Sequence, residues 1–370
     1  MSLLDRYLAR EILLPFAAGL LFLTQVLLAT QVLAQGDVLL GSGVSLLDVL
    51  LVALDLTPHL LGYVLPVSFL LGCVLGVGRL AEDRELVALG AAGISPARLV
   101  KVPLLVGLGA AAVALWLSLD VEPAGLRAAR LRVDEVVKKN VSADVRPGVF
   151  YEEIPGLTLY AEQVSGGTWR HVLISDHSDP RAPLLALADG GRLEPAGAGE
   201  TMQLVLQGGE IHREEAGAGD YVIASFARAS VAVGLGGALG ERNRLTGSPF
   251  ELRADEIAAL AAERGARDPE EGRRWRAFLH RRVAGPVGIL AFALLAVPIG
   301  ASRRGGRAFG YAATLLSVIG YYAVMRLGEG LAQRGVLAPW LGPHLGNVVG
   351  AVAGMAAVLL MSRRGAGAVR

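Results

Sequence analysis

A group of charged residues lies in the segment Gly78–Lys101, whose pattern predicts two short helices joined by glycines. These residues are Glu82, Asp83, Arg84 and Glu85. Apolar residues recur on one face of Leu80–Leu89, which predicts an amphipathic helix with its carboxylates turned elsewhere. A carboxylate presented in this way can form charge-assisted hydrogen bonds with a cationic partner protein. The alternative is a short helix that lies on a membrane surface.

Other ionisable residues occur within or beside long apolar stretches. Arg326 and Glu329 are three residues apart, so a helix places them on one face. A pair of this kind at membrane depth indicates a functional site, or an internal ion pair that only locks the helix. A basic cluster could bind the phosphates of a lipid headgroup or remain solvated. It consists of Arg127, Arg130 and Arg132.

Motifs for catalysis and metal binding are missing from the sequence. There is no Walker loop, no His-Glu-x-x-His and no Gly-x-Ser-x-Gly, and the six histidines are scattered. We therefore expect no catalytic residue, no metal site and no cofactor bound by this chain. A formal charge of +1 and 53% hydrophobic residues argue against a nucleic-acid-binding protein. Cys73 is the single cysteine, so no disulfide can form within the chain.

Long apolar stretches predict an α+β membrane protein with six transmembrane helices in a 3+3 arrangement, because about 20 apolar residues cross a bilayer. The predicted spans are Ile12–Ala34, Leu56–Gly78, Val102–Leu119, Val283–Ala301, Ala308–Leu331 and Trp340–Met361. They divide the chain into residues 1–121, an extramembrane block 122–282 and residues 283–370. Small residues four apart predict close helix approach, within the chain or against a second chain. They are Gly72 and Gly76, and Gly346, Gly350 and Gly354.

Lys and Arg in the short loops predict the orientation of the chain. Most of them fall on one side if the spans alternate, whereas the opposite short loops contain only Arg334. Both termini are therefore expected in the cytoplasm, with the block 122–282 outside. The basic residues are Arg6, Arg10, Arg79, Arg84, Arg98, Lys101, Arg303, Arg304, Arg307, Arg363, Arg364 and Arg370.

The outer block alternates between apolar and polar residues, which predicts an antiparallel sandwich or open barrel between the third and fourth spans. The predicted strands are Val149–Glu153, Thr158–Val164, His171–Ser175, Leu184–Ala188, Gln203–Leu206, Glu210–Arg213 and Tyr221–Val233. Apolar residues expected on the inner face could line a lipid conduit or fill a closed core. They include Leu159, Ile174 and Leu206, together with Phe150, Leu187 and Ile223.

Several motifs together resemble the LptF/LptG permease family, the transmembrane subunits of the lipopolysaccharide exporter. They are Arg6-Tyr7-Leu8 through Arg10-Glu11, then Arg79-Leu80 with Glu82-Asp83-Arg84-Glu85-Leu86, then Ala91-Ala92-Gly93-Ile94-Ser95, and finally Pro339-Trp340 with Asn347. The layout of three spans, a periplasmic β-jellyroll and three spans is similar over the whole chain. The likeness slightly favours LptF.

The resemblance implies one permease of an ABC transporter in the bacterial inner membrane. In that family an LptB-like ATPase dimer binds ATP and Mg²⁺, and a second LptF/LptG-type permease completes the transporter. Lipopolysaccharide then passes through the jellyroll to an LptC-like periplasmic protein. Glu85 matches the acidic position that contacts an arginine of the ATPase. The family's basic residues at the outer end of the first span have no match here, where Thr24, Gln25, Gln31 and Gln35 occur.

Two other functions remain open. One is a secondary transporter gated by an intramembrane carboxylate such as Asp55 or Glu329. The other is a mechanotransmission protein, which uses ATP hydrolysis by a partner to move a periplasmic domain without transporting lipid.

Overall fold

The computed structural model describes residues 2–34, 45–144, 147–154, 157–165, 168–177, 183–196, 201–214, 221–233, 248–302 and 306–364. Loop arginines 303, 304 and 370, on which the predicted orientation partly depends, lie outside these ranges. The chain forms two compact units. The helical unit comprises Met1–Gln31, Ala53–Ala128 and Pro249–Arg370, and the sheet unit comprises Val32–Val52 and Ala129–Ser248. Residues 249–282, expected in the outer block, therefore pack within the helical unit.

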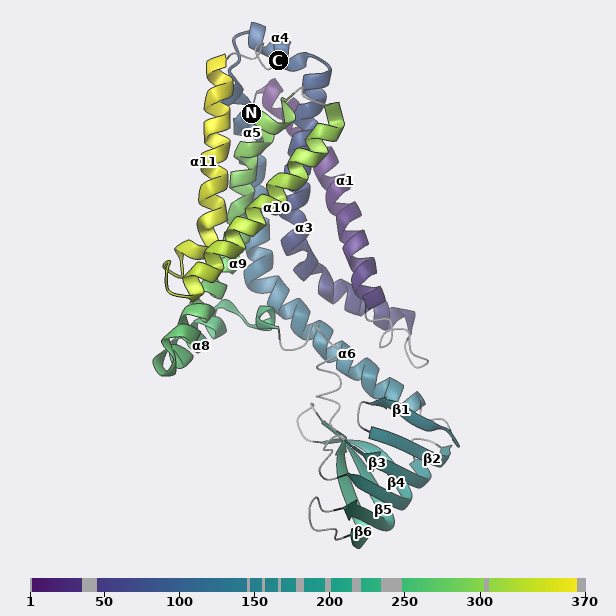
Figure 1. Ribbon diagram of the computed structural model, residues 1–370. Coiled ribbons are helices and arrows are strands. Elements are labelled where there is room, and N and C mark those ends of the chain that lie inside the picture. Colours follow the sequence, from purple (N-terminus) through teal and green to yellow (C-terminus); the bar gives the residue numbers. More distant parts are fainter. Residues whose placement is uncertain are drawn as a thin grey trace. The chain divides into compact units, whose positions relative to one another are not determined.

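Long helices dominate the helical unit (Figure 1). Five stretches among the described residues are long and apolar enough to cross a membrane, namely α1, α3, Pro96–Val133, α9 and α11. The short helix α4 lies at one end of this unit and α8 at the other, here termed the α4 end and the α8 end. The helices are α1 (Leu3–Ala34), α3 (Leu46–Glu82), α4 (Glu85–Ala91), α5 (Pro96–Trp116), a π-helical turn (Leu117–Val121), α6 (Glu122–Asp144), a 3₁₀ turn (Pro249–Glu251), α8 (Ala254–Arg267), α9 (Pro269–Gly300), α10 (Gly306–Gln333) and α11 (Leu341–Arg364).

The core of the helical unit is built around α3. Phe69, Leu70 and Cys73 of this helix are fully buried. In contrast, α1 leaves Leu14 75% exposed and Phe22 66% exposed. Such a continuous apolar surface is stable only against lipid or another protein, so α1 is a peripheral helix with a bilayer or partner on its outer side.

Glycines allow α1 to approach α3 closely. A Cβ atom on Gly72 would lie 2.6 Å from the Cα of Phe16, and one on Gly76 would lie 2.7 Å from the backbone oxygen of Glu11. Pro15 lacks an N–H, so the Glu11 oxygen has no helical donor and its side of α1 is open to this approach. The other small residues also pack within the chain, since Gly346 faces Tyr321 and Gly354 faces Leu294.

Side chains from outside α9 hydrogen-bond to two of its backbone oxygens, one of which has lost its helical donor to a proline. Pro286 has no N–H to donate to the oxygen of Arg282, and the Ser118 hydroxyl donates to that oxygen instead at 3.1 Å. The oxygen of Ala284 accepts from the Tyr321 hydroxyl at 3.1 Å and from the Asn347 amide at 3.0 Å. An unsatisfied oxygen would be costly in an apolar environment. These contacts fix the π-helical turn after α5, and α10 and α11, against α9.

The sheet unit contains a six-stranded antiparallel sheet whose strands follow chain order. The predicted antiparallel pairing is confirmed, but the segments Gln203–Leu206 and Glu210–Arg213 form one strand rather than two. A jellyroll would require a second facing layer, and that feature stays a prediction. The strands are β1 (Phe150–Ile154), β2 (Leu157–Ser165), β3 (Thr168–Asp176), β4 (Leu184–Ala196), β5 (Thr201–Glu214) and β6 (Tyr221–Val233).

One face of the sheet carries a buried apolar layer. Leu159 and Ile174 are directly paired across β2 and β3, and both are fully buried, as is Leu206. The prediction was wrong for three other residues, because Phe150, Leu187 and Ile223 are exposed. Leu187 lies between the buried Ala186 and Ala188, so its strand alternates regularly but with the alanines facing inward. A two-residue period predicts alternation, and does not by itself decide which set of residues faces the core.

The close approach of α1 to α3 predicts opposite effects for two glycines of α3. Gly76→Ala should lower the free energy of unfolding by about 1–3 kcal/mol, because its methyl group would press on the α1 backbone. Gly62→Ala is the matched control, since no atom lies within 4 Å of its Cβ position and alanine favours helix. Thermal unfolding in detergent measures both. Equal stability of the two variants would contradict the packing.

Candidate functional site

The connection between α3 and α5 contains the acidic residues singled out in the sequence. The predicted helix Leu80–Leu89 is interrupted, because α3 continues to Glu82 and α4 begins at Glu85. Arg84 lies between them with φ 60°, a left-handed conformation that is uncommon outside glycine. After α4, Gly93 has φ 81°, and the Ser95 hydroxyl accepts from the backbone N–H of Arg98 to cap α5. These breaks turn α4 out of line with both long helices.

The four predicted residues have different surroundings. Glu82, Asp83 and Arg84 are exposed, and Asp83 forms an ion pair with Arg79 at 3.7 Å. Glu85 is partly buried and both of its carboxylate oxygens lie 3.0 Å from the Tyr7 hydroxyl, which donates to them. The structure thus brings the predicted residues together at one turn and adds a contact with Tyr7, which the sequence indicated only as part of a family motif.

Two further residues of α1 contact the α3–α5 connection. Asp5 is 1% exposed and forms ion pairs with Arg98 at 2.8 Å and Lys101 at 3.5 Å. Glu11 accepts from Arg79 at 2.7 Å. We name Asp5, Tyr7 and Glu11 the α1 anchor, because together they join the start of α1 to both sides of α4. The Arg6–Glu11 motif was noted in the sequence, but its partners are remote and could not be identified there.

Two residues of the α1 anchor, Asp5 and Tyr7, have shifted pKa values. The backbone N–H of Ser2 and the guanidinium of Arg98 lower the pKa of Asp5 to about 2, although burial opposes this. The pKa of Tyr7 is raised by burial and by the neighbouring Glu85 carboxylate. Asp5 therefore remains charged and Tyr7 remains a hydrogen-bond donor throughout the physiological pH range.

The pair Arg326 and Glu329 lies at the α8 end and has a third member. Arg326 donates to Glu329 at 3.2 Å, and Arg281 lies 3.5 Å from the same carboxylate. The side chain of Glu329 is 6% exposed, whereas that of Arg326 is 60% exposed. Two guanidinium groups on one buried carboxylate are typical of a structural ion-pair network, and the exposed Arg326 retains room for an anion.

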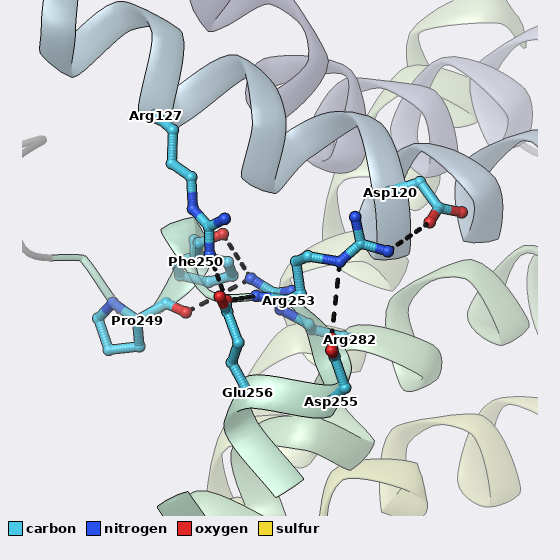
Figure 2. A network of polar contacts seen from close by, with 8 residues as sticks. All are labelled: Asp120, Arg127, Pro249, Phe250, Arg253, Asp255, Glu256 and Arg282. Atoms are coloured by element: carbon cyan, nitrogen blue, oxygen red, sulfur yellow. Dashed lines mark hydrogen bonds and ion pairs between the residues drawn. The ribbon is translucent and has the colours of Figure 1, made fainter. Parts of the chain in front are cut away.

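The basic cluster is divided between the two units. Arg127 belongs to the helical unit and forms an ion pair with Glu256 of α8, whereas Arg130 and Arg132 belong to the sheet unit. Glu256 also accepts from the backbone N–H of Arg253 at 2.6 Å. Figure 2 shows these contacts. The guanidinium of Arg127 binds a carboxylate in this structure, and a phosphate site formed by the three arginines stays a prediction.

The same network joins the beginning of α6 to α8 and α9. Arg253 lies 3.9 Å from Asp120 and 3.6 Å from Asp255, while Arg282 donates to the backbone oxygens of Phe250 and Pro249 (Figure 2). Arg282 is itself only 2% exposed, so its charge depends on these acceptors. No cluster of metal-binding side chains occurs in the part of the chain that the structure describes.

The lowered pKa of Asp5 predicts a defined pH dependence. Its contribution to stability is complete above its ordinary pKa of about 3.8 and is lost as the pH falls through about 2. Asp5→Asn should therefore unfold at a lower temperature than wild type at pH 5–7, and the difference should shrink toward pH 2. Asp255→Asn, at an exposed position, is the control. A difference of constant size down to pH 2 would exclude this role for Asp5.

Comparison with known proteins identifies the relatives of the chain. The sequence model of a family described as "Lipopolysaccharide export system permease LptF/LptG" matches residues 6–362. No curated protein sequence matches the chain closely. The family match covers Tyr7 and Glu11 of the α1 anchor, α4, the sheet and nearly the whole length of the long helices, and it begins one residue after Asp5. Together with the apolar helices it makes the chain a multi-pass membrane protein, and the chain belongs to the lipopolysaccharide export permease family LptF/LptG.

Proposed function

We propose that this chain is the permease subunit of an ATP-driven ABC transporter, which extracts lipopolysaccharide from the bacterial inner membrane and passes it to a periplasmic bridge. The observation that carries the proposal is the family match over residues 6–362. The chain supplies the lipid path and the moving helices. A separate LptB-like ATPase dimer binds ATP and Mg²⁺ and supplies the energy.

The proposed topology has six spans, with α10 as the fifth. With 28 residues, α10 extends about 42 Å as a helix, more than the roughly 30 Å of a bilayer core. Leu315, Leu316 and Ile319 are exposed on it and would face lipid or protein. Both termini and α4 are cytoplasmic in this topology, and the sheet unit is periplasmic.

In this proposal, α4 is the element that docks on the ATPase. The left-handed Arg84 and the glycine turn after α4 direct it away from the long helices, and Glu85 offers a carboxylate to an arginine of the ATPase. The Tyr7 hydroxyl orients that carboxylate. Because the α1 anchor holds both sides of α4, a displacement of α4 is passed directly to α1.

The partners follow from the surfaces that the chain leaves uncovered. The exposed apolar side of α1 would contact a second LptF/LptG-type permease or enclose the acyl chains of lipopolysaccharide. At the α8 end of the helical unit, the exposed Arg326 is a candidate for contact with a phosphate of lipopolysaccharide, and Arg130 and Arg132 are candidates in the sheet unit. An LptC-like protein would extend the sheet unit. No nucleic acid is expected as a partner.

Passage of lipid through the sheet unit requires a change in its inner layer. Leu159, Ile174 and Leu206 are fully buried here, so this layer is closed. A conduit would expose these residues during transport. A secondary transporter gated by Glu329 is less well supported, because Arg281 and Arg326 both bind that carboxylate. A mechanotransmission protein would share the coupling through α4 but would release no lipid.

The coupling role of Glu85 can be tested by charge reversal. Glu85→Lys should reduce binding of the ATPase by about tenfold or more, since loss of a hydrogen-bonded ion pair and like-charge repulsion together exceed about 1.4 kcal/mol. Binding to the ATPase and lipopolysaccharide release from proteoliposomes are both measured. The control is Glu263→Lys, an exposed charge reversal on α8. Normal release by the Glu85 variant would rule out the assignment.

Tyr7→Phe separates docking from transmission. It leaves the Glu85 carboxylate available to the ATPase but removes the hydrogen bonds to α1. We expect normal ATPase binding and hydrolysis with less lipopolysaccharide released per ATP. If the variant releases as much lipid per ATP as wild type, Tyr7 has no part in coupling. If the wild type itself hydrolyses ATP without releasing lipid, the mechanotransmission alternative is favoured.

A further inference from the structure

A cavity of about 840 Å³ opens at the α4 end of the helical unit. Residues of α1, α3, α9 and α10 line it, and the docking residue Glu85 does not. A volume of this size is common for sites that hold small organic ligands. Neither the docking of α4 nor the transfer of lipopolysaccharide to the periplasm requires a cavity in this position.

The cavity has a charged rim. Arg10, Arg79 and Arg84 line it together with Glu11 and Glu82. Three positive and two negative side chains leave a formal charge of +1. Arg79 is occupied by Glu11 at 2.7 Å, whereas Arg10 and Arg84 form no ion pair with any residue that the structure describes. The rim therefore offers two exposed guanidinium groups to a singly charged anion, such as a phosphodiester.

Beyond the charged rim the wall of the cavity is apolar and partly open, since Leu14 is 75% exposed. Leu14 follows Arg10 by one helical turn in α1, and Leu75 precedes Arg79 by one turn in α3. One turn is about 5.4 Å, so both helices change from charged to apolar side chains at the same depth. Ile299 adds to this wall from α9. The two levels match a ligand with an anionic head and a hydrocarbon tail.

We infer that this cavity binds an anionic glycerophospholipid. Its phosphodiester lies between Arg10 and Arg84, and the start of one acyl chain lies along Leu14 and Leu75. In the proposed topology the α4 end faces the cytoplasm, so the lipid comes from the inner leaflet rather than from the transported pool. A free phosphate would satisfy the two arginines but would leave the apolar wall uncovered.

The test uses the purified full chain in a neutral detergent, titrated with phosphatidylglycerol and followed by native mass spectrometry. The double variant Arg10→Gln/Arg84→Gln should bind the lipid at least fivefold more weakly than wild type. Arg6→Gln/Arg363→Gln removes two exposed arginines that do not line the cavity and should bind normally. Phosphatidylcholine, which has no net charge, should bind more weakly than phosphatidylglycerol to the wild type.

A second variant tests the apolar wall without changing charge. Gly78→Leu would extend into the cavity, and its Cβ would lie at an ordinary 3.7 Å from the nearest atom, the backbone oxygen of Gly300. It should reduce lipid binding while keeping the thermal stability of wild type. Equal lipid binding by the arginine variants and wild type would overturn the inference. So would full displacement of the lipid by an equal concentration of glycerol phosphate or inorganic phosphate, which would assign the site to a free phosphate.

Discussion

The buried carboxylate of Asp5 is the contact on which the α4 end of the helical unit depends. A carboxylate that is 1% exposed is stable only with charged or hydrogen-bonding partners. Arg98, Lys101 and the backbone of Ser2 supply them, and α1 is therefore held to the beginning of α5. With this contact in place, Tyr7 and Glu11 reach Glu85 and Arg79, and the α1 anchor encloses α4. A movement imposed on α4 then has a direct route to α1.

In the rest of the helical unit, packing depends on hydrogen bonds to backbone oxygens, because an oxygen without a donor is costly in an apolar environment. Prolines remove helical donors, and residues from other helices replace them, as Ser118 does for Arg282. Glycines let backbones meet where a side chain would separate them, as Gly76 does beside Glu11. Proline and glycine weaken a helix in water, but here they allow the contacts that position α1, α5, α10 and α11.

The sequence was sufficient for features that depend on local pattern. Apolar length predicted the long helices, and alternation predicted the antiparallel sheet between them. Predictions from the pattern were wrong where the backbone adopts a left-handed conformation. Arg84 divides the predicted helix Leu80–Leu89, and Gly208 lies inside β5, which had been predicted as two strands. The contacts of Asp5, Tyr7 and Arg127 were not predictable, because their partners lie far along the chain and ion-pair geometry leaves no local signal.

In the proposed transporter, α1 and α4 move as one body when the ATPase hydrolyses ATP. This movement can be measured with pairs of spin labels on engineered cysteines, because the native Cys73 is buried and would not react. One pair joins exposed positions Arg6 and Ala88, and a second joins Arg6 and Ser362 on α11. With ATP and vanadate, we expect the first distance to stay constant and the second to change. A change in the distance between Arg6 and Ala88 would contradict the account.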